Sequence, residues 1–156
     1  MLGLRYRFRL WKIFTLLMLV TASSAAHSAP SDNPTVEQLK TRVASTDVRD
    51  RPHLCVDIAQ KQLTEADKFY AASEFEKGQA ALTDVVAYAE LARDYAIQSH
   101  KYQKQAEIAT RNMTRKLNDL LHSLGGPDQA PVRDAINRLQ RVRDDLLASM
   151  FPKGAK

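Results

Sequence analysis

The segment from Glu74 to Ser123 contains no proline and only one glycine, Gly78, and this lack of helix-breaking residues constrains the fold more than any other feature of the sequence. Apolar residues recur along it at intervals of three and four, which is the spacing of a helix that buries one face. A continuous helix over this segment would measure about 75 Å. The polar stretch 98–101 interrupts the apolar pattern. We therefore expect one long helix that is either continuous or kinked near Ser99.

Helical patterns also precede this segment. Thr35 and Gln38 have the spacing of a capping box, in which each side chain accepts a hydrogen bond from the backbone N–H of the other residue, and they predict a short first helix. A second helix is expected over about 52–72, with a proline in its first turn. Ser73 and Glu76 repeat the capping-box spacing, which predicts a tight turn into the long helix.

A strong stop signal ends the long helix. Gly125 and Gly126 are followed by Pro127, so we expect a glycine in the left-handed conformation to cap the helix and the proline to prevent its continuation. A last helix should start near Asp128 or Pro131 and run antiparallel to the end of the long helix, because the connection is short. No stretch alternates apolar and polar residues as a strand would. The sequence predicts an all-α fold of helical hairpins that share one long central helix.

The stretch ADKFYAASEFEKGQAALTDVV, from Ala66 to Val86, resembles a tetratricopeptide-type helical hairpin. The resemblance is carried by two packing positions of the first helix, the turn and three positions of the second helix: Ala66, Phe69, Ser73, Phe75, Gly78 and Leu82. Gln62 and Glu65 depart from the pattern, no closing proline follows, and the match covers about one repeat. The resemblance implies that Ser73 stands at the turn-glycine position and that the two helices approach closely at Gly78. It also implies protein or peptide binding instead of catalysis.

The N-terminus has the three parts of a secretory signal peptide. Its basic beginning is followed by the apolar run 13–20 and then by small residues, which predicts a signal peptide over 1–26. We expect cleavage between Ala26 and His27, with cleavage after Ser28 as the second choice. The alternative is an uncleaved membrane anchor, although the apolar stretch is shorter than the ~20 residues that a spanning helix needs. A flexible leader over 27–34, a single helical domain over 35–151 and a tail over 152–156 would complete the chain.

The strong basic charge of the chain belongs mostly to this N-terminal segment. The whole sequence has 23 Lys and Arg against 18 Asp and Glu, but four of the basic residues and none of the acidic ones lie before His27. The exported form would therefore carry a net charge of only +1. This near-neutral charge argues against a nucleic-acid partner, which a basic protein would favour.

The chemistry-bearing residues do not form a recognisable catalytic or metal site. Cys55 is the only cysteine, which excludes an internal disulfide and a zinc site made of cysteines. On a helix, His53 and Asp57 share a face and Cys55 points away from them, so we expect the cysteine to be buried and the other two residues to form a solvated pair. In an oxidising compartment Cys55 could alternatively form an intermolecular disulfide. His100 and His122 lack a histidine partner at helical spacing, and we predict no catalytic residue, no metal and no cofactor.

Three tyrosines recur at intervals of seven residues: Tyr88, Tyr95 and Tyr102. One interpretation is an aromatic strip that binds a partner helix or peptide. The other is ordinary packing at the edge of the core, with the hydroxyls reaching solvent. Tyr102 lies beside the polar stretch 98–101, so it is the tyrosine that we expect to be least covered.

Basic residues gather in the C-terminal part of the chain: Arg111, Arg115, Lys116, Arg133, Arg138, Arg141 and Arg143. Acidic residues interleave with them: Asp119, Asp134, Asp144 and Asp145. This mixture favours a solvated face with ion pairs between residues four apart. The alternative is a docking surface for an acidic partner in the cell envelope.

These observations predict an exported, non-enzymatic helical protein, periplasmic or secreted, that acts through a protein partner or through self-association. A membrane would be involved only through an uncleaved signal peptide. An alternative is a carrier of a small ligand or cofactor, with a pocket between helices lined by Cys55, Phe69, Tyr70 and Tyr88. A third is an enzyme whose active-site residues are too dispersed to be recognised.

Overall fold

A computed structural model describes residues 34–152 of the chain. The predicted signal peptide, its cleavage position at Ala26 and His27, and almost all of the predicted leader and tail lie outside the described residues. The described part contains the helices α2 (Val36–Ser45), α3 (Arg51–Ala71), α4 (Phe75–Ser99), α5 (Gln103–Ser123) and α6 (Gln129–Met150), with a short 3-10 turn at Gly126–Asp128. It contains no strand, so the predicted all-α fold is confirmed for these residues.

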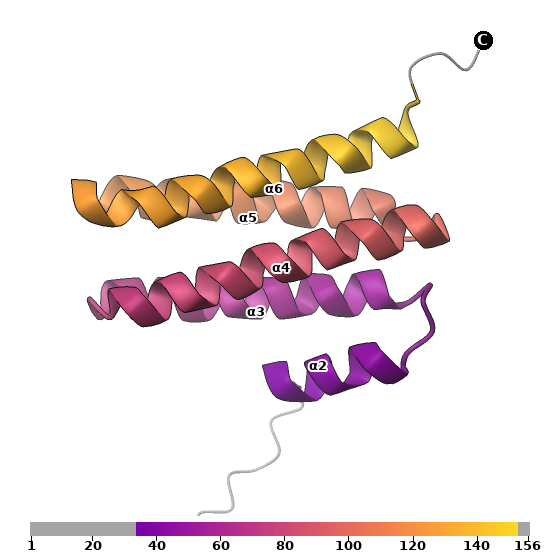
Figure 1. Ribbon diagram of the computed structural model, residues 1–156, viewed down its shortest axis with the longest axis horizontal. Coiled ribbons are helices and arrows are strands. Elements are labelled where there is room, and N and C mark those ends of the chain that lie inside the picture. Colours follow the sequence, from indigo (N-terminus) through magenta and orange to yellow (C-terminus); the bar gives the residue numbers. More distant parts are fainter. Residues whose placement is uncertain (1–33, 153–156) are drawn as a thin grey trace, which may run out of the picture. The chain divides into compact units, whose positions relative to one another are not determined.

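The four long helices form two stacked hairpins (Figure 1). Helices α3 and α4 are antiparallel, and so are α5 and α6. The hairpins are stacked so that α3 lies beside α5 and α4 beside α6, and each of these neighbouring pairs runs in the same direction. Two ion pairs join α4 and α6. Arg138 contacts Glu90, and Arg93 contacts Asp145 further along both helices, as expected for parallel neighbours. The structure therefore places the first helices of the two hairpins side by side.

The prediction of one long central helix is wrong, because the chain reverses direction between Ser99 and Gln103. Both His100 and Tyr102 have positive φ angles, 54° and 59°. The Ser99 hydroxyl donates to the Tyr95 carbonyl and accepts from the Lys101 backbone N–H, which ends α4 without a proline or a glycine. The break lies at the predicted polar stretch, but it produces a full turn where a kink was expected.

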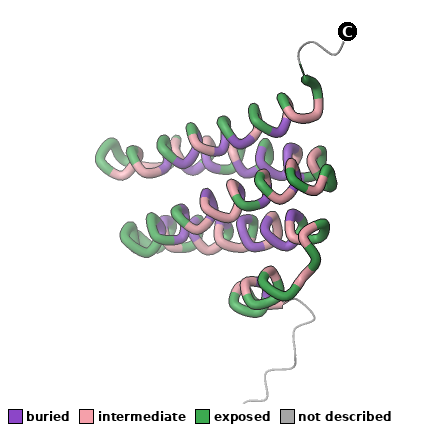
Figure 2. Tube along the Cα trace, turned by 45° about the vertical axis from the view of Figure 1, so that its right-hand side comes forward, coloured by how far each residue is buried: buried purple, intermediate pink, exposed green. Residues whose placement is uncertain are grey.

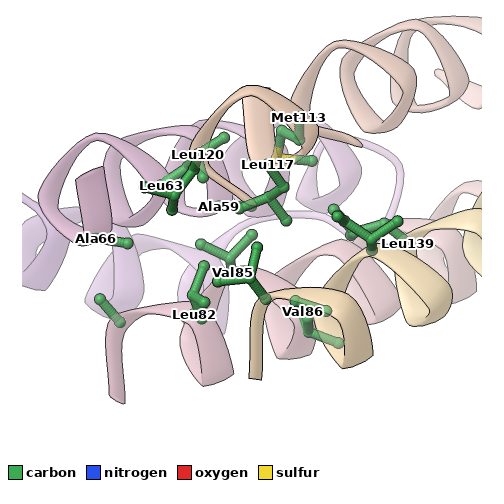
Figure 3. Close-up of a cluster of buried hydrophobic side chains, with 14 of the residues drawn as sticks. Ala59, Leu63, Ala66, Leu82, Val85, Val86, Met113, Leu117, Leu120 and Leu139 are labelled. Carbon is green, nitrogen blue, oxygen red and sulfur yellow. The ribbon is translucent and has the colours of Figure 1, made fainter. Parts of the chain in front are cut away.

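One apolar core explains why the chain reverses there. Buried side chains from all four long helices meet in one cluster, and Figure 3 draws 14 of its residues and labels ten of them, from α3, α4, α5 and α6. Met113, Leu117 and Leu120 of α5 belong to this cluster together with Leu63 of α3. A continuous helix would carry these three residues about 20–30 Å beyond Ser99, away from Leu63, at ~1.5 Å per residue. Burial of their apolar surface therefore favours the turn. Figure 2 shows the buried positions facing between the helices.

Helix α2 covers the outer face of the first hairpin. The capping box of Thr35 and Gln38 is confirmed, with both of its hydrogen bonds formed. Leu39 is fully buried against apolar residues of α3, and Lys40 donates to Asp84 of α4 over 3.1 Å. Partial burial lowers the pKa of Lys40, but its hydrogen bonds and charge interactions with Asp84 and Glu37 together outweigh this effect, so the pKa is raised overall. The apolar contact and the ion pair together attach α2 to both helices of the hairpin.

The predicted capping box of Ser73 and Glu76 is wrong, since Ser73 instead ends α3. Its φ of 61° is left-handed, whereas a residue that caps the start of a helix is normally extended. The backbone N–H of Ser73 donates to the Tyr70 carbonyl, and that of Glu74 donates to the Phe69 carbonyl. These two bonds form a Schellman motif, in which the left-handed position is usually glycine.

We therefore expect the Ser73→Gly variant to be more stable than the wild type, by about 1 kcal/mol, because glycine adopts the left-handed conformation without steric cost. Ala71→Gly is the matched control: Ala71 is exposed and is the last residue of α3, in a helical conformation, so glycine there should cost up to about 1 kcal/mol. Urea denaturation monitored by circular dichroism measures both changes. Equal destabilisation by the two variants would contradict the role given to Ser73.

The connection between α5 and α6 also differs in detail from the prediction. The helix stops at the predicted place, but no glycine takes a left-handed cap: α5 ends at Ser123, its capping residue Leu124 is extended, and Gly125 is extended as well. The side-chain amide of Gln129 donates to the carbonyls of Leu121 and Leu124. This amide satisfies groups at the end of α5 that a glycine cap would otherwise serve. The predicted antiparallel packing of the last helix is present.

In the described part of the chain, none of the helices has the combination of length and apolar character needed to cross a membrane.

Candidate binding groove

A groove runs between α3 and α5 along the surface of the two hairpins. Its first section has a volume of about 780 Å³ and continues into a second section of about 430 Å³, and both sections share Leu63, Thr64 and Lys116. The groove exists because the two helices lie side by side in the same direction, although their starts at Arg51 and Gln103 lie 52 residues apart in the sequence. We call this feature the α3–α5 groove.

The floor of the α3–α5 groove is apolar. It consists of Leu63, Met113 and Leu120, which are 4%, 2% and 8% exposed and also belong to the core cluster. Figure 3 shows these three side chains coming from the two helices that form the groove. Because the floor side chains are part of the core, the packing of the core fixes their positions.

The rim of the groove is polar and exposed. Arg115 lines the first section, Lys116 lines both, and Asp67 and Asp119 line the second. No hydrogen bond or ion pair engages these four side chains within residues 34–152. Asp57 also lines the first section, but it is already paired with His53, whose Nε2 lies 3.5 Å from Oδ2 of Asp57. The rim therefore presents two cations and two carboxylates to an approaching ligand.

The three predicted tyrosines do not form one open strip. Instead, each ring faces a basic or imidazole side chain of this chain's own first two helices. Lys40 lies 5.7 Å from the ring centre of Tyr88, and Arg51 lies 5.3 Å from that of Tyr95. The ring of His53 stacks on Tyr102, with the centroids 6.1 Å apart. Partial burial raises the pKa of Tyr88. The proposed binding of a partner through these tyrosines stays a prediction, and their observed contacts hold α2 and the start of α3 to α4 and its following turn.

Cys55 is completely buried, as the helical pattern indicated. Burial disfavours the thiolate and raises the pKa of Cys55 to about 11, against a smaller opposing effect of the Arg51 charge. An intermolecular disulfide at Cys55 stays a prediction, and it would require the core to open first because a thiolate must reach the partner sulfur.

The buried thiol predicts an alkaline loss of stability. The folded state keeps its proton to about pH 11, whereas the unfolded state loses it near the ordinary pKa of 9.0. Above pH 9 the unfolded state therefore binds fewer protons, and the free energy of unfolding falls as the pH rises. At pH 10 the expected contribution is a loss of about 1 kcal/mol.

Urea denaturation of wild type and Cys55→Val under reducing conditions, at pH 8 and at pH 10, measures this contribution. Other titrating groups are common to both proteins, so the difference between them isolates the thiol. The wild type should lose about 1 kcal/mol more than the variant between the two pH values. An identical pH dependence would show that Cys55 has no raised pKa.

The His53–Asp57 pair is solvated as predicted, with the His53 side chain 62% exposed. In the described part, no three residues among His, Cys, Asp and Glu come together as ligands of a metal ion. The residues proposed for a carrier pocket, Cys55, Phe69, Tyr70 and Tyr88, do not line the α3–α5 groove.

The C-terminal basic residues have different partners from those predicted. Arg138 forms a bidentate pair with Glu90, and Arg143 and Arg111 both contact the largely buried carboxylate of Glu107. Asp145 pairs with Arg93 of α4, 2.9 Å away. Most of these pairs therefore join different helices, and only the contact between Arg111 and Glu107 has the predicted spacing of four residues.

Sequence reasoning did not identify the α3–α5 groove. In the sequence, Arg115 and Lys116 belong to one basic set with the arginines of α6. The structure separates them from that set and places them opposite α3. Asp67, on α3, was not recognised at all. Only the neighbouring positions of α3 and α5 bring these side chains together, and no local pattern indicates that arrangement.

No protein-family model, curated protein or solved structure that was compared with this chain matches it.

Proposed function

We propose that this chain is an exported, non-enzymatic helical protein that binds another polypeptide, and that the α3–α5 groove is the binding surface. The observation that carries the proposal is an apolar floor bordered by charged side chains that have no partner within the described residues. Protein interfaces commonly combine an apolar centre with a polar rim in this way.

The dimensions of the groove favour an elongated ligand. Its lining on α5 extends from Asn112 to Ser123, which corresponds to about 16 Å along the helix axis. An extended polypeptide spans that distance with about five residues at ~3.3 Å each. A small-molecule site usually encloses most of its ligand, whereas this groove lies along the surface between two helices.

The stacking of the hairpins also supports polypeptide binding. Stacked helical hairpins form extended surfaces from equivalent helices of successive units, and such proteins use these surfaces for binding. Here α3 and α5 are the equivalent first helices, and they form the groove. The tetratricopeptide resemblance of residues 66–86 implies the same class of function.

Export is tested separately from binding. Mass spectrometry of the protein purified from the cells that make it should find a mature N-terminus at His27, because the sequence before it has the pattern of a cleaved signal peptide. Recovery of the protein from the cytosol with residues 1–26 attached would contradict export.

Selection from a displayed random-peptide library, followed by fluorescence anisotropy with the selected peptides, tests the groove. Thr64→Trp places a large side chain in the groove, and Thr41→Trp is its matched control on the outer face of α2. Both threonines are exposed, and each hydroxyl donates to the carbonyl four residues earlier. The two substitutions should therefore perturb their helices similarly.

We expect Thr64→Trp to weaken the selected peptides at least about tenfold, a change of ~1.4 kcal/mol, and Thr41→Trp to leave their affinity unchanged. The proposal fails if no peptide is selected or if the two variants bind alike. Dimerisation of the wild type that Thr64→Trp abolishes would also overturn it, because the groove would then hold a second copy of this chain.

A further inference from the structure

The open charges on the rim of the α3–α5 groove are separated by sign along its length. Arg115 lies in the first section and Lys116 lies where the two sections meet, whereas Asp67 and Asp119 lie in the second. Asp57 also lines the first section and is paired with His53. Lys61 also lines the first section and is already engaged within the chain. The unpaired rim charges therefore change from cationic, at Arg115 and Lys116, to anionic, at Asp67 and Asp119, in the direction of α3 and α5.

None of these four charges is compensated by an ion pair within residues 34–152. Arg115 and Asp119 are four residues apart on one helix, a spacing at which an ion pair can form, yet no such pair is present. Asp67, on the opposite helix, likewise contacts none of the cations across the groove. A ligand that complements both parts would have to carry both signs of charge, since a ligand of one sign would meet repulsion at one end.

The spacing of the two parts matches an extended peptide. Arg115 and Lys116 precede Asp119 by three to four residues, which is about 5 Å along α5. In an extended chain, side chains two residues apart point to the same side and lie about 6.6 Å from each other. A separation of four residues, about 13 Å in an extended chain, would carry one of the two charges well past Asp119.

We propose that the polypeptide bound in the α3–α5 groove is an extended segment with an acidic side chain two residues from a basic one. The acidic side chain faces Arg115 and Lys116, the basic one faces Asp67 and Asp119, and apolar neighbours contact the floor of Leu63, Met113 and Leu120. This inference rests on the proposed function, and it adds the charge pattern of the partner to it.

Three synthetic fluorescein-labelled heptapeptides test the pattern. The mixed-charge probe is Leu-Ser-Glu-Ser-Lys-Ser-Leu, and the controls replace its two charged residues by two glutamates or by two lysines. All three probes have the same apolar ends. Fluorescence anisotropy at low ionic strength measures their affinities for the full chain. We expect the mixed-charge probe to bind at least about fivefold more tightly than either control, with the preference shrinking as salt is added.

Charge-reversal variants provide the decisive measurement. Asp67→Lys combined with Asp119→Lys makes the rim cationic throughout, and should switch the preference to the doubly acidic probe. Arg115→Glu combined with Lys116→Glu makes it anionic, and should switch the preference to the doubly basic probe. All four side chains are exposed, so the fold should tolerate the changes, and circular dichroism checks this.

These measurements distinguish polypeptide binding in the α3–α5 groove from the charge pattern inferred for the bound segment. If the probes bind and Thr64→Trp weakens them, but no charge preference or switch is seen, the groove binds polypeptides and the charge pattern is wrong. If the library selection yields no groove-dependent peptide and none of the probes binds, both proposals are wrong. A preference that switches in both reversed variants supports the inference.

Discussion

Replacing Leu139 with alanine is expected to lower the free energy of unfolding by about 3 kcal/mol. Leu139 is fully buried on α6, and its side chain belongs to the cluster that also contains Leu63 of α3, Val86 of α4 and Leu117 of α5 (Figure 3). Truncation removes apolar contacts and leaves a cavity, and changes of this kind in a packed core cost about 2–5 kcal/mol. Urea denaturation monitored by circular dichroism measures the loss.

Leu91→Ala is the matched control for this variant. Leu91 lies on α4 but is 38% exposed, so truncation there should cost less than about 1 kcal/mol. Because the cluster joins both hairpins, the Leu139 variant should still unfold in a single transition, seen alike by circular dichroism and by tyrosine fluorescence. Separate transitions for the two probes, or equal effects at the two leucines, would contradict a shared core.

Replacing Gly78 with leucine is expected to cost about 1 kcal/mol, although leucine favours helices more than glycine does. A Cβ atom at Gly78 would lie 2.8 Å from two ring carbons of Tyr70, which is itself 5% exposed and cannot move into solvent without losing its packing. Overpacking of this kind costs about 1–3 kcal/mol, and the gain in helix propensity of ~0.8 kcal/mol offsets only part of it. The close approach of the two helices at Gly78 agrees with the geometry that the tetratricopeptide resemblance implied for this residue.

Two further variants separate the steric clash with Tyr70 from the general effect of placing a leucine on α4. Ala80→Leu, at an exposed position of the same helix, should change stability by less than about 0.5 kcal/mol. In a Tyr70→Ala background the ring is absent, so the cost of Gly78→Leu should fall by at least about 1 kcal/mol. Thermal and urea denaturation of the four proteins of this cycle give the coupling. Additive effects of the two substitutions would show that the contact between Gly78 and Tyr70 does not limit the packing.

The helices themselves could be predicted because their signals are local. The capping box of Thr35 and Gln38, the proline at the start of α3 and the stop after α5 all act within a few residues, and each marks a real boundary. The pattern at Ser73 was misleading because a serine followed by a glutamate three residues later has the same sequence whether the serine begins a helix or ends one. Its role depends on the φ angle, which the packing of the hairpin determines.

The reversal after Ser99 and the α3–α5 groove could not be predicted from local patterns. No residue between Ser99 and Gln103 obliges a turn. The free energy that favours the turn comes from burying Met113, Leu117 and Leu120 against α3 residues that lie fifty or more positions earlier. The groove follows from the same contact between distant segments. A heptad-like series of tyrosines suggested one continuous strip, but the turn places Tyr102 beyond the end of α4.

The outer side of α2 is polar and exposed, with residues such as Gln38, Thr41 and Arg42, and this limits where a further hairpin can be added to the stack. A helix with a polar outer face closes a stack, so new units added beyond that face would find no apolar surface to contact. A helical hairpin inserted between the two existing hairpins would contact an apolar surface on each of its two sides. A chain in which residues 51–102 are duplicated in tandem would keep both outer faces and gain a third hairpin, and the surface formed by its first helices would become wider by one helix.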